Sequence, residues 1–211
     1  MRETHDAGGC ALAGYLAALE VPATRYVLHY DADMLLHQAP GYDWAHEAAG
    51  YMAADRDLIA GVPRTSPPPH DVVGVRDGPS QREGLPFWPV DGGWKNAWFS
   101  TRCFLLDREK LREYLPLMSG RVLIETLAVK YLKRGYPRSP EIMLYRRLQG
   151  RAWRLNLSTR RAWLLHPLYK PDRYVELLPL ISEHVARGDC PDAQRGDPEV
   201  NIAAWEQYVA Q

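Results

Sequence analysis

Two acidic residues with one residue between them, Asp31 and Asp33, follow directly after the hydrophobic segment 26–30. Side chains two residues apart on an extended chain point in the same direction, so the two carboxylates can approach a common centre. Carboxylate oxygens are ligands that Mg²⁺ and Mn²⁺ prefer, and a divalent ion held there can neutralise phosphate groups. The alternative is a turn in which the aspartates cap the next segment, and the spacing alone leaves both interpretations open.

The elements that position these aspartates are expected to alternate between helices and strands. Residues 25–31 are rich in β-branched and aromatic side chains and are predicted to form a buried strand. Asp31 and Asp33 then lie at its carboxyl end, where ligands bind in open α/β sheets. Further strands are expected at 57–63, 97–107 and within 152–167, and helices at 10–20, 43–55, 108–118, 121–136, 173–188 and the C-terminus. This order predicts a mixed α/β fold.

The chain is expected to contain a core, residues 1–170, and a C-terminal helical extension, residues 171–211. Residues 63–92 are rich in proline and glycine and are predicted to form a long loop, which in a compact domain is usually functional or mobile.

Composition excludes some classes of partner. Lysine and arginine together number 26, as do aspartate and glutamate, so the net charge is zero and nucleic acid is not an expected partner. Six late arginines could meet phosphates or lipid head groups, or could form a solvated basic face: Arg146, Arg147, Arg151, Arg154, Arg160 and Arg161.

The compartment is predicted from cysteines and apolar segments. Cys10, Cys103 and Cys190 are far apart and odd in number, which indicates free thiols in a reducing environment. No apolar run approaches the length of a membrane span, and the N-terminal residues lack the apolar region of a signal peptide. We therefore expect a cytoplasmic protein, with a membrane-peripheral location left open.

Several segments, taken in order, resemble GT-A-fold glycosyltransferases similar to glycosyltransferase family 2. RYVLHYDADMLLHQ resembles the hydrophobic strand and D-x-D motif of that family, and GGCALAGYLAALE resembles the helix that leads into this strand. The segments DGGW, AWFSTRCFLLDREKL, LIETLAVKYLKRGY and AWLLHP follow in the family order. The resemblance covers about residues 6–170 and implies a GT-A-like, Rossmann-like mixed sheet flanked by helices.

The resemblance also implies roles for individual residues. Asp31 and Asp33 would bind Mn²⁺ or Mg²⁺ together with the diphosphate of a nucleotide-sugar donor, and His166 would complete the metal site. The glycine-bearing loop near the donor sugar would contain Gly92, Gly93 and Trp94.

Glu125 is the catalytic base that the resemblance implies, because inverting members carry an acidic residue at this helix start. The family usually has Glu-Asp there with the aspartate as base, whereas this chain has Glu125-Thr126. The alternative is an acid near a helix N-terminus that is stabilised by the helix dipole.

Aromatic residues near the predicted donor loop allow two interpretations. They could form a wall that stacks on a sugar or could pack in the core: Trp88, Trp94, Trp98 and Phe99. His29, inside the predicted strand, is expected to pack there or to support the aspartates.

The expected activity is metal-dependent transfer of a sugar, with inversion, from a nucleotide-sugar to a hydroxyl of a glycan, lipid or small molecule. One difficulty is that only 30 residues precede Asp31, so the nucleotide-binding strands of the family are expected to be missing and the fold N-terminally truncated. A partner chain, a longer natural chain or a non-catalytic interaction protein that no longer binds donor would each account for this. The open sheet edge would favour a homo-oligomer. A nucleotidyltransferase is a further alternative, but its glycine-rich basic loop is absent from the sequence.

Overall fold

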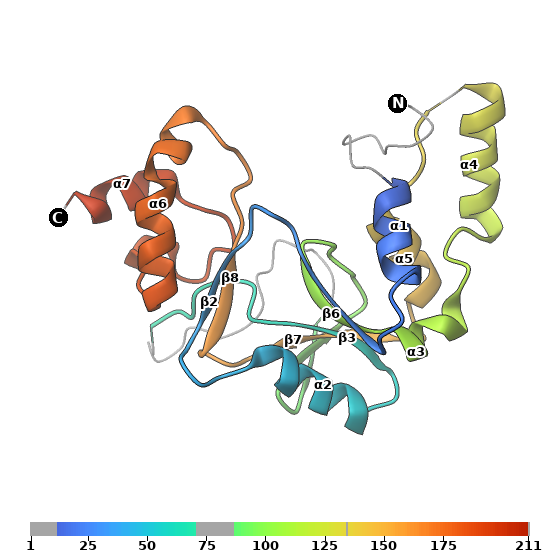
Figure 1. The fold of residues 1–211 in the computed structure, drawn as a ribbon, viewed down its shortest axis with the longest axis horizontal. Helices are drawn as coiled ribbons and strands as arrows, with labels where there is room; N and C mark the ends of the chain where they lie inside the picture. The colour runs from blue at the N-terminus through green and yellow to red at the C-terminus, as the bar shows by residue number, and fades with distance from the viewer. Residues whose placement is uncertain (1–11, 71–86, 134, 211) are drawn as a thin grey trace.

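The computed structural model describes residues 12–70, 87–133 and 135–210, and within these ranges the strands form two sheets (Figure 1). Cys10 and the expected start of the first helix lie outside the described residues, as does most of the predicted long loop. The larger sheet has six strands in the order β1 (Tyr26–Tyr30), β6 (Cys103–Asp107), β3 (Leu58–Val62), β7 (Trp153–Leu157), β5 (Gly93–Asn96) and β4 (Trp88–Val90). The smaller sheet pairs β2 (Leu35–Gln38) with β8 (Ala162–Leu165).

The six-stranded sheet is mixed in direction. Strand β6 runs antiparallel to both β1 and β3, β3 runs parallel to β7, and β5 runs antiparallel to both β7 and β4. The carboxyl ends of β1, β3 and β7 therefore meet at one edge, where β6 and β5 begin. The predicted mixed sheet flanked by helices is confirmed.

Helices cover both faces of the larger sheet and one side of the smaller one (Figure 1). They are α1 (Leu12–Glu20), α2 (Trp44–Ala54), α3 (Arg108–Leu111), α4 (Gly120–Leu132), α5 (Pro140–Leu148), α6 (Asp172–Arg187) and α7 (Ile202–Val209), with 3₁₀ turns η2 (Arg112–Tyr114) and η3 (Asp192–Gln194). Helix α1 lies against α5, α2 packs against β3, and α6 packs against β2 and α7. In the described part of the chain, every helix is too short or too polar to cross a membrane.

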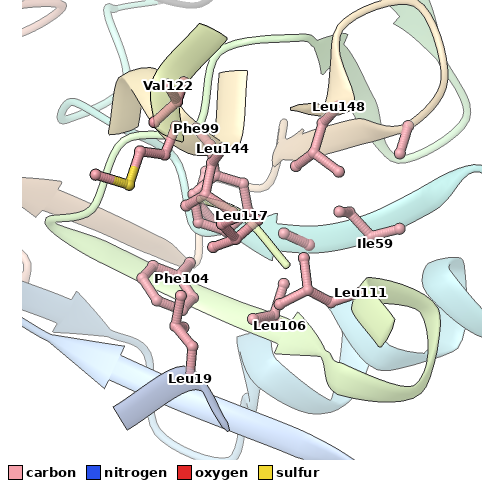
Figure 2. Packing of buried hydrophobic residues seen from close by; sticks show 14 of the residues in the cluster. Leu19, Ile59, Phe99, Phe104, Leu106, Leu111, Leu117, Val122, Leu144 and Leu148 are labelled. Atoms are coloured by element: carbon pink, nitrogen blue, oxygen red, sulfur yellow. The ribbon is translucent and has the colours of Figure 1, made fainter. Parts of the chain in front are cut away.

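The core is built by strand alternation. On β6, Phe104 and Leu106 face one side, where they join Leu19 and Leu144 from helices α1 and α5 (Figure 2). The intervening Leu105 faces the other side and packs with residues of α2. Because both faces are covered, β3 and β6 are buried along their whole length and carry no alternating polar pattern.

A third apolar cluster joins the smaller sheet to the C-terminal helices. On β8, Trp163 and Leu165 pack with Tyr174 and Ile181 of α6 and with Trp205 of α7. The alternate β8 residues face the core under the larger sheet. Strand β8 thus connects the C-terminal helices to the rest of the fold.

Several elements differ from the sequence expectations. Strand β2, helix α5 and the β4–β5 hairpin were not predicted, and the strand expected at 97–107 begins only at Cys103. The helix expected at 108–118 ends early, because proline cannot continue a helix and Pro116 follows a turn of 3₁₀ helix.

Candidate functional site

A cavity of about 320 Å³ opens at the sheet edge where β3 ends and β6 begins. Its lining residues come from the loop before β6, from the ends of β3 and β8, and from the start of α5. They are Met34, Val62, Thr65, Trp98, Ser100, Arg102, Cys103, Glu141, Arg154, Leu164, Leu165, His166, Pro198 and Glu199. The mixture of two arginines, two glutamates and a histidine with apolar walls is typical of a small-molecule site.

Asp31 and Asp33 lie in a reverse turn directly after β1, next to this cavity. The Met34 amide donates to the Asp31 carbonyl at 3.1 Å, which closes the turn directly after β1. The Asp31 amide donates to the carbonyl of Arg102 at 2.7 Å, and Arg102 lines the cavity. Both aspartates are thus next to cavity residues although neither lines the cavity itself.

The two carboxylates have different partners. An oxygen of Asp31 lies 3.0 Å from His29 Nε2, whereas Asp33 Oδ2 lies 2.5 Å from Lys170 Nζ and 3.6 Å from His166 Nε2. The predicted convergence of Asp33 with His166 is therefore present, but Asp31 faces a different histidine. His29 also stacks on Phe104, with 5.1 Å between ring centroids, so it both packs and supports Asp31.

His166 is fixed by backbone pairing. Its amide donates to the Pro198 carbonyl at 2.9 Å and its carbonyl accepts from Val200 at 3.1 Å, which ties the end of β8 to the chain before α7. The His166 ring lines the cavity through this arrangement. Its buried Nδ1 has no hydrogen-bond partner among the described residues.

Burial favours the neutral form of His166. Burial and then the nearby Arg102 lower the pKa of His166, and Asp33 and Asp31 offset this only in part. A neutral imidazole is the form that binds a metal ion. Burial raises the pKa of Asp33, but the Lys170 hydrogen bond outweighs it, together with His166, which is protonated at the acidic pH where Asp33 titrates. The net pKa of Asp33 is lowered, so the carboxylate stays ionised at neutral pH.

Glu141 is the acidic residue that the sequence analysis missed. It lines the cavity at the first turn of α5, and its Oε1 accepts from the Thr101 amide at 2.9 Å and from the Thr101 hydroxyl at 3.2 Å. The sequence carried a usable signal, because Ser139 caps the helix and Pro140 occupies its first turn, a combination that predicts a helix start.

Tyr15 packs edge-on against His29, with 5.3 Å between the ring centroids. Burial, then Asp31, then Glu141 raise the pKa of the Tyr15 hydroxyl, which means that both carboxylates lie close enough to act on it. Within the described part of the chain the buried hydroxyl has no hydrogen-bond partner. Trp98, on the cavity wall, lies against Tyr145 of α5 at 5.4 Å between ring centroids.

Glu125 lies elsewhere, on α4, among arginines of α4, of α5 and of the segment between them. Its carboxylate accepts from Arg138 at 2.6 Å, from Arg121 at 2.7 Å and from Arg146 at 3.2 Å. Hydrogen bonds from Arg138 and Arg121 lower its pKa to about 2. So low a pKa makes a weak base, and Glu125 does not line the cavity.

The predicted donor loop lies in the β4–β5 hairpin, at the end of the strand order opposite to β1. Gly92 (φ +77°) lies in the turn that joins β4 to β5, and a Cβ there would collide with the Tyr51 ring. A Cβ on Gly93 would collide with the backbone carbonyl of Asn156 on β7. Strand β5 is four places from β1, or roughly 19 Å at the usual strand spacing, and Trp94 does not line the cavity. Packing therefore accounts for both glycines.

The predicted aromatic wall is divided in the same way. Phe99 is a core residue and Trp88 packs edge-on against Trp153, whereas Trp98 alone of the four lines the cavity. The late arginines do not form one face: Arg154 is buried beside Asn156 at 2.9 Å and lines the cavity, while Arg161 lies over the Tyr42 ring. Cys103 and Cys190 are buried free thiols.

A metal ion would find an incomplete set of protein ligands here. No group of three or more histidine, cysteine or acidic side chains with metal-binding geometry occurs in residues 12–70, 87–133 and 135–210. Asp33 and His166 converge, and Lys170 at present pairs with the same carboxylate oxygen. Mg²⁺ is commonly held by one or two carboxylates together with substrate phosphates, so this pair fits an ion that arrives with a phosphate ligand rather than a preformed cage.

Comparisons of the chain with known protein families, with curated proteins and with solved structures each give no match. The functional argument therefore rests on the site itself.

Proposed function

We propose that this protein transfers a sugar from a nucleotide-sugar donor to an acceptor hydroxyl, using the cavity between the aspartate turn and α5. The observation that carries the proposal is a cavity lined by His166, Glu141 and Arg102, with Asp33 beside it at 3.6 Å from His166. A GT-A-like fold is part of the same proposal. It is supported by the mixed sheet and by a D-x-D turn directly after a strand.

The donor diphosphate would lie near the aspartate turn. Asp33 and His166 would hold Mn²⁺ or Mg²⁺ there, which when bound supplies positive charge to the leaving diphosphate. Arg102, which lines the cavity next to the aspartate turn, would add positive charge, and Lys170 would move from Asp33 to a phosphate oxygen. Asp31 would orient the turn through His29 and through its backbone bond to Arg102.

Glu141, rather than Glu125, would act as the base. The acceptor oxygen attacks the anomeric carbon, the bond from that carbon to the diphosphate oxygen breaks, and its electron pair leaves with the nucleoside diphosphate. The acceptor proton passes to the Glu141 carboxylate, which Thr101 holds in place through two hydrogen bonds to one oxygen. Trp98 would offer an apolar face to the sugar ring.

Donor binding can be tested without knowing the acceptor. Thermal unfolding is followed with a panel of UDP-, GDP- and dTDP-sugars, each with and without Mn²⁺. A donor that binds the folded state raises the midpoint, and Asp33→Asn should abolish the rise. The matched control is Asp172→Asn, at the exposed start of α6, which should keep it.

The two functional hypotheses give opposite results in this experiment. A shift with at least one donor that requires Asp33 supports the enzyme. If no donor shifts the midpoint, the enzyme proposal is wrong for this chain and the non-catalytic interaction protein is the better account.

A further inference from the structure

Helix α4 carries an apolar face that points away from the protein. Ile124 is 68 % exposed, Leu127 42 % and Tyr131 71 %, although all three are large hydrophobic residues. Val122 and Val129 are the buried residues of the same helix. At 3.6 residues per turn the three exposed side chains lie on the side opposite the two valines, so the apolar face is the outward one.

Among the residues that the structure describes, α4 lies at the edge of the fold. Figure 1 shows α4 as the outermost helix on its side of the molecule, beyond α1 and α5. Val122 joins the main core cluster and anchors the helix to it (Figure 2). The face is convex and belongs to a single helix.

Positive charge borders the apolar face on both sides. Arg121 and Lys130 are exposed and lie at its two margins by helical spacing, and the Lys130 ammonium lies 5.4 Å from the Tyr131 ring centroid. Arg121 pairs with Glu125, the single acid of α4, but Arg138 and Arg146 pair with the same carboxylate, so positive charge remains in excess there. The surface around the helix is therefore basic.

We propose that α4 docks this face on an anionic lipid bilayer, with Ile124, Leu127 and Tyr131 inserted at the level of the head groups. An interfacial helix of this kind combines an apolar face with lysine and arginine at its borders, and tyrosine is favoured at the membrane–water boundary. The 13 residues of α4 extend about 20 Å, which suits a helix lying in the plane of the interface rather than crossing it.

A lipid surface fits these features better than a protein partner does. The cores of protein interfaces are depleted in lysine, whereas anionic lipids attract it. A convex helix also needs a groove on a protein partner, but needs only a soft surface on a bilayer. The proposal goes beyond sugar transfer and does not depend on it.

The test is vesicle flotation of the full chain. Vesicles of phosphatidylcholine alone are compared with vesicles of phosphatidylcholine and phosphatidylglycerol in equal amounts. The protein should bind the anionic vesicles, bind the neutral ones weakly, and be released by high salt. Replacing Ile124 and Leu127 by glutamine should lower the partition coefficient by about tenfold or more, since each loses a buried apolar side chain.

Two further variants make the result specific. Val175→Gln with Leu180→Gln replaces two exposed apolar side chains of α6 in the same way and should leave binding unchanged. Lys130→Gln tests the charge independently and should reduce binding to anionic vesicles only. Unchanged melting curves confirm that the variants fold.

Three outcomes would overturn the proposal. They are no binding to anionic vesicles, equal binding by the wild type and the α4 variants, and a concentration-dependent dimer of the wild type that the α4 variants abolish. The last outcome would assign the face to a second copy of the chain.

Discussion

Replacing Gly93 by alanine separates a packing role of the hairpin from a donor-binding role. The new Cβ would collide with the Asn156 carbonyl oxygen and lie 3.1 Å from the Leu157 Cα. Restoring an ordinary carbon–oxygen contact of about 3.3 Å moves β5 away from β7 by about 1 Å, which is enough to break the nearest ladder hydrogen bonds. Two lost bonds at about 1 kcal/mol each, plus the overpacking, give a destabilisation of about 3 kcal/mol.

The assay is thermal unfolding followed by circular dichroism. For a chain of this length a loss of about 3 kcal/mol lowers the midpoint by about 6–12 °C. Gly50→Ala is the matched control, because Gly50 lies exposed within α2 with no atom near its would-be Cβ. That variant should raise stability by about 1 kcal/mol, since alanine favours the helix. If Gly93→Ala keeps full stability but loses donor binding, the packing argument is refuted and the glycine belongs to a donor loop.

Three other predictions follow from the structure. Glu141→Gln should lower turnover of a bound donor by about 10²–10⁴-fold, because glutamine keeps the hydrogen bonds from Thr101 but cannot take a proton; Glu125→Gln should leave turnover unchanged, and the reverse pattern would restore Glu125 as the base. The pKa of Glu125 is lowered to about 2 from an ordinary 4.5, so its stabilising effect is complete above about pH 4.5 and is lost as the pH falls toward 2. Between these pH values the free energy of unfolding, measured with denaturant, should fall less steeply with pH in Glu125→Gln than in the wild type. An equal fall in both proteins would contradict the ion pairs of Glu125 with the arginines. Asp107→Ala should cost about 2–4 kcal/mol of stability, because this buried side chain both caps α3 and pairs with Arg25. Asp43→Ala removes only the exposed cap of α2 and should cost about 1 kcal/mol. Equal unfolding midpoints of the two variants in urea would argue against the pairing of Asp107 with Arg25.

The local sequence pattern was sufficient to predict the strands and helices whose hydrophobic residues recur at regular spacing. The strands at 26–30, 58–62 and 153–157 and the helices α2, α4 and α6 lie where the sequence predicts them, within a few residues. Helix α5 was missed although Ser139 and Pro140 mark a helix start. The hairpin β4–β5 was missed because proline and glycine dominate its surroundings, and its pairing with β7 depends on residues more than 50 positions away.

In the candidate site, too, the sequence predicted some contacts, and others depend on the tertiary structure. Asp33 and His166 were predicted to meet and lie 3.6 Å apart, although 133 positions separate them in the sequence. Spacing could not show that the turn after β1 sends Asp31 toward His29, nor that Lys170 pairs with Asp33. Glu141 reaches the cavity only because α5 packs against α1 and faces the loop before β6, which is a tertiary arrangement that no local pattern contains.

The proposed site binds a divalent ion jointly with a nucleoside diphosphate. The direct measurement is the electron paramagnetic resonance signal of free Mn²⁺, titrated with protein alone and with protein plus UDP or GDP. Because Asp33 and His166 supply only part of a coordination shell, we predict that the protein alone binds Mn²⁺ weakly. The protein and the nucleotide together should bind Mn²⁺ at least about tenfold more tightly than the nucleotide does without the protein. His166→Gln and Asp33→Asn should each remove this gain. Equal Mn²⁺ binding with and without the protein at every nucleotide concentration would contradict the account.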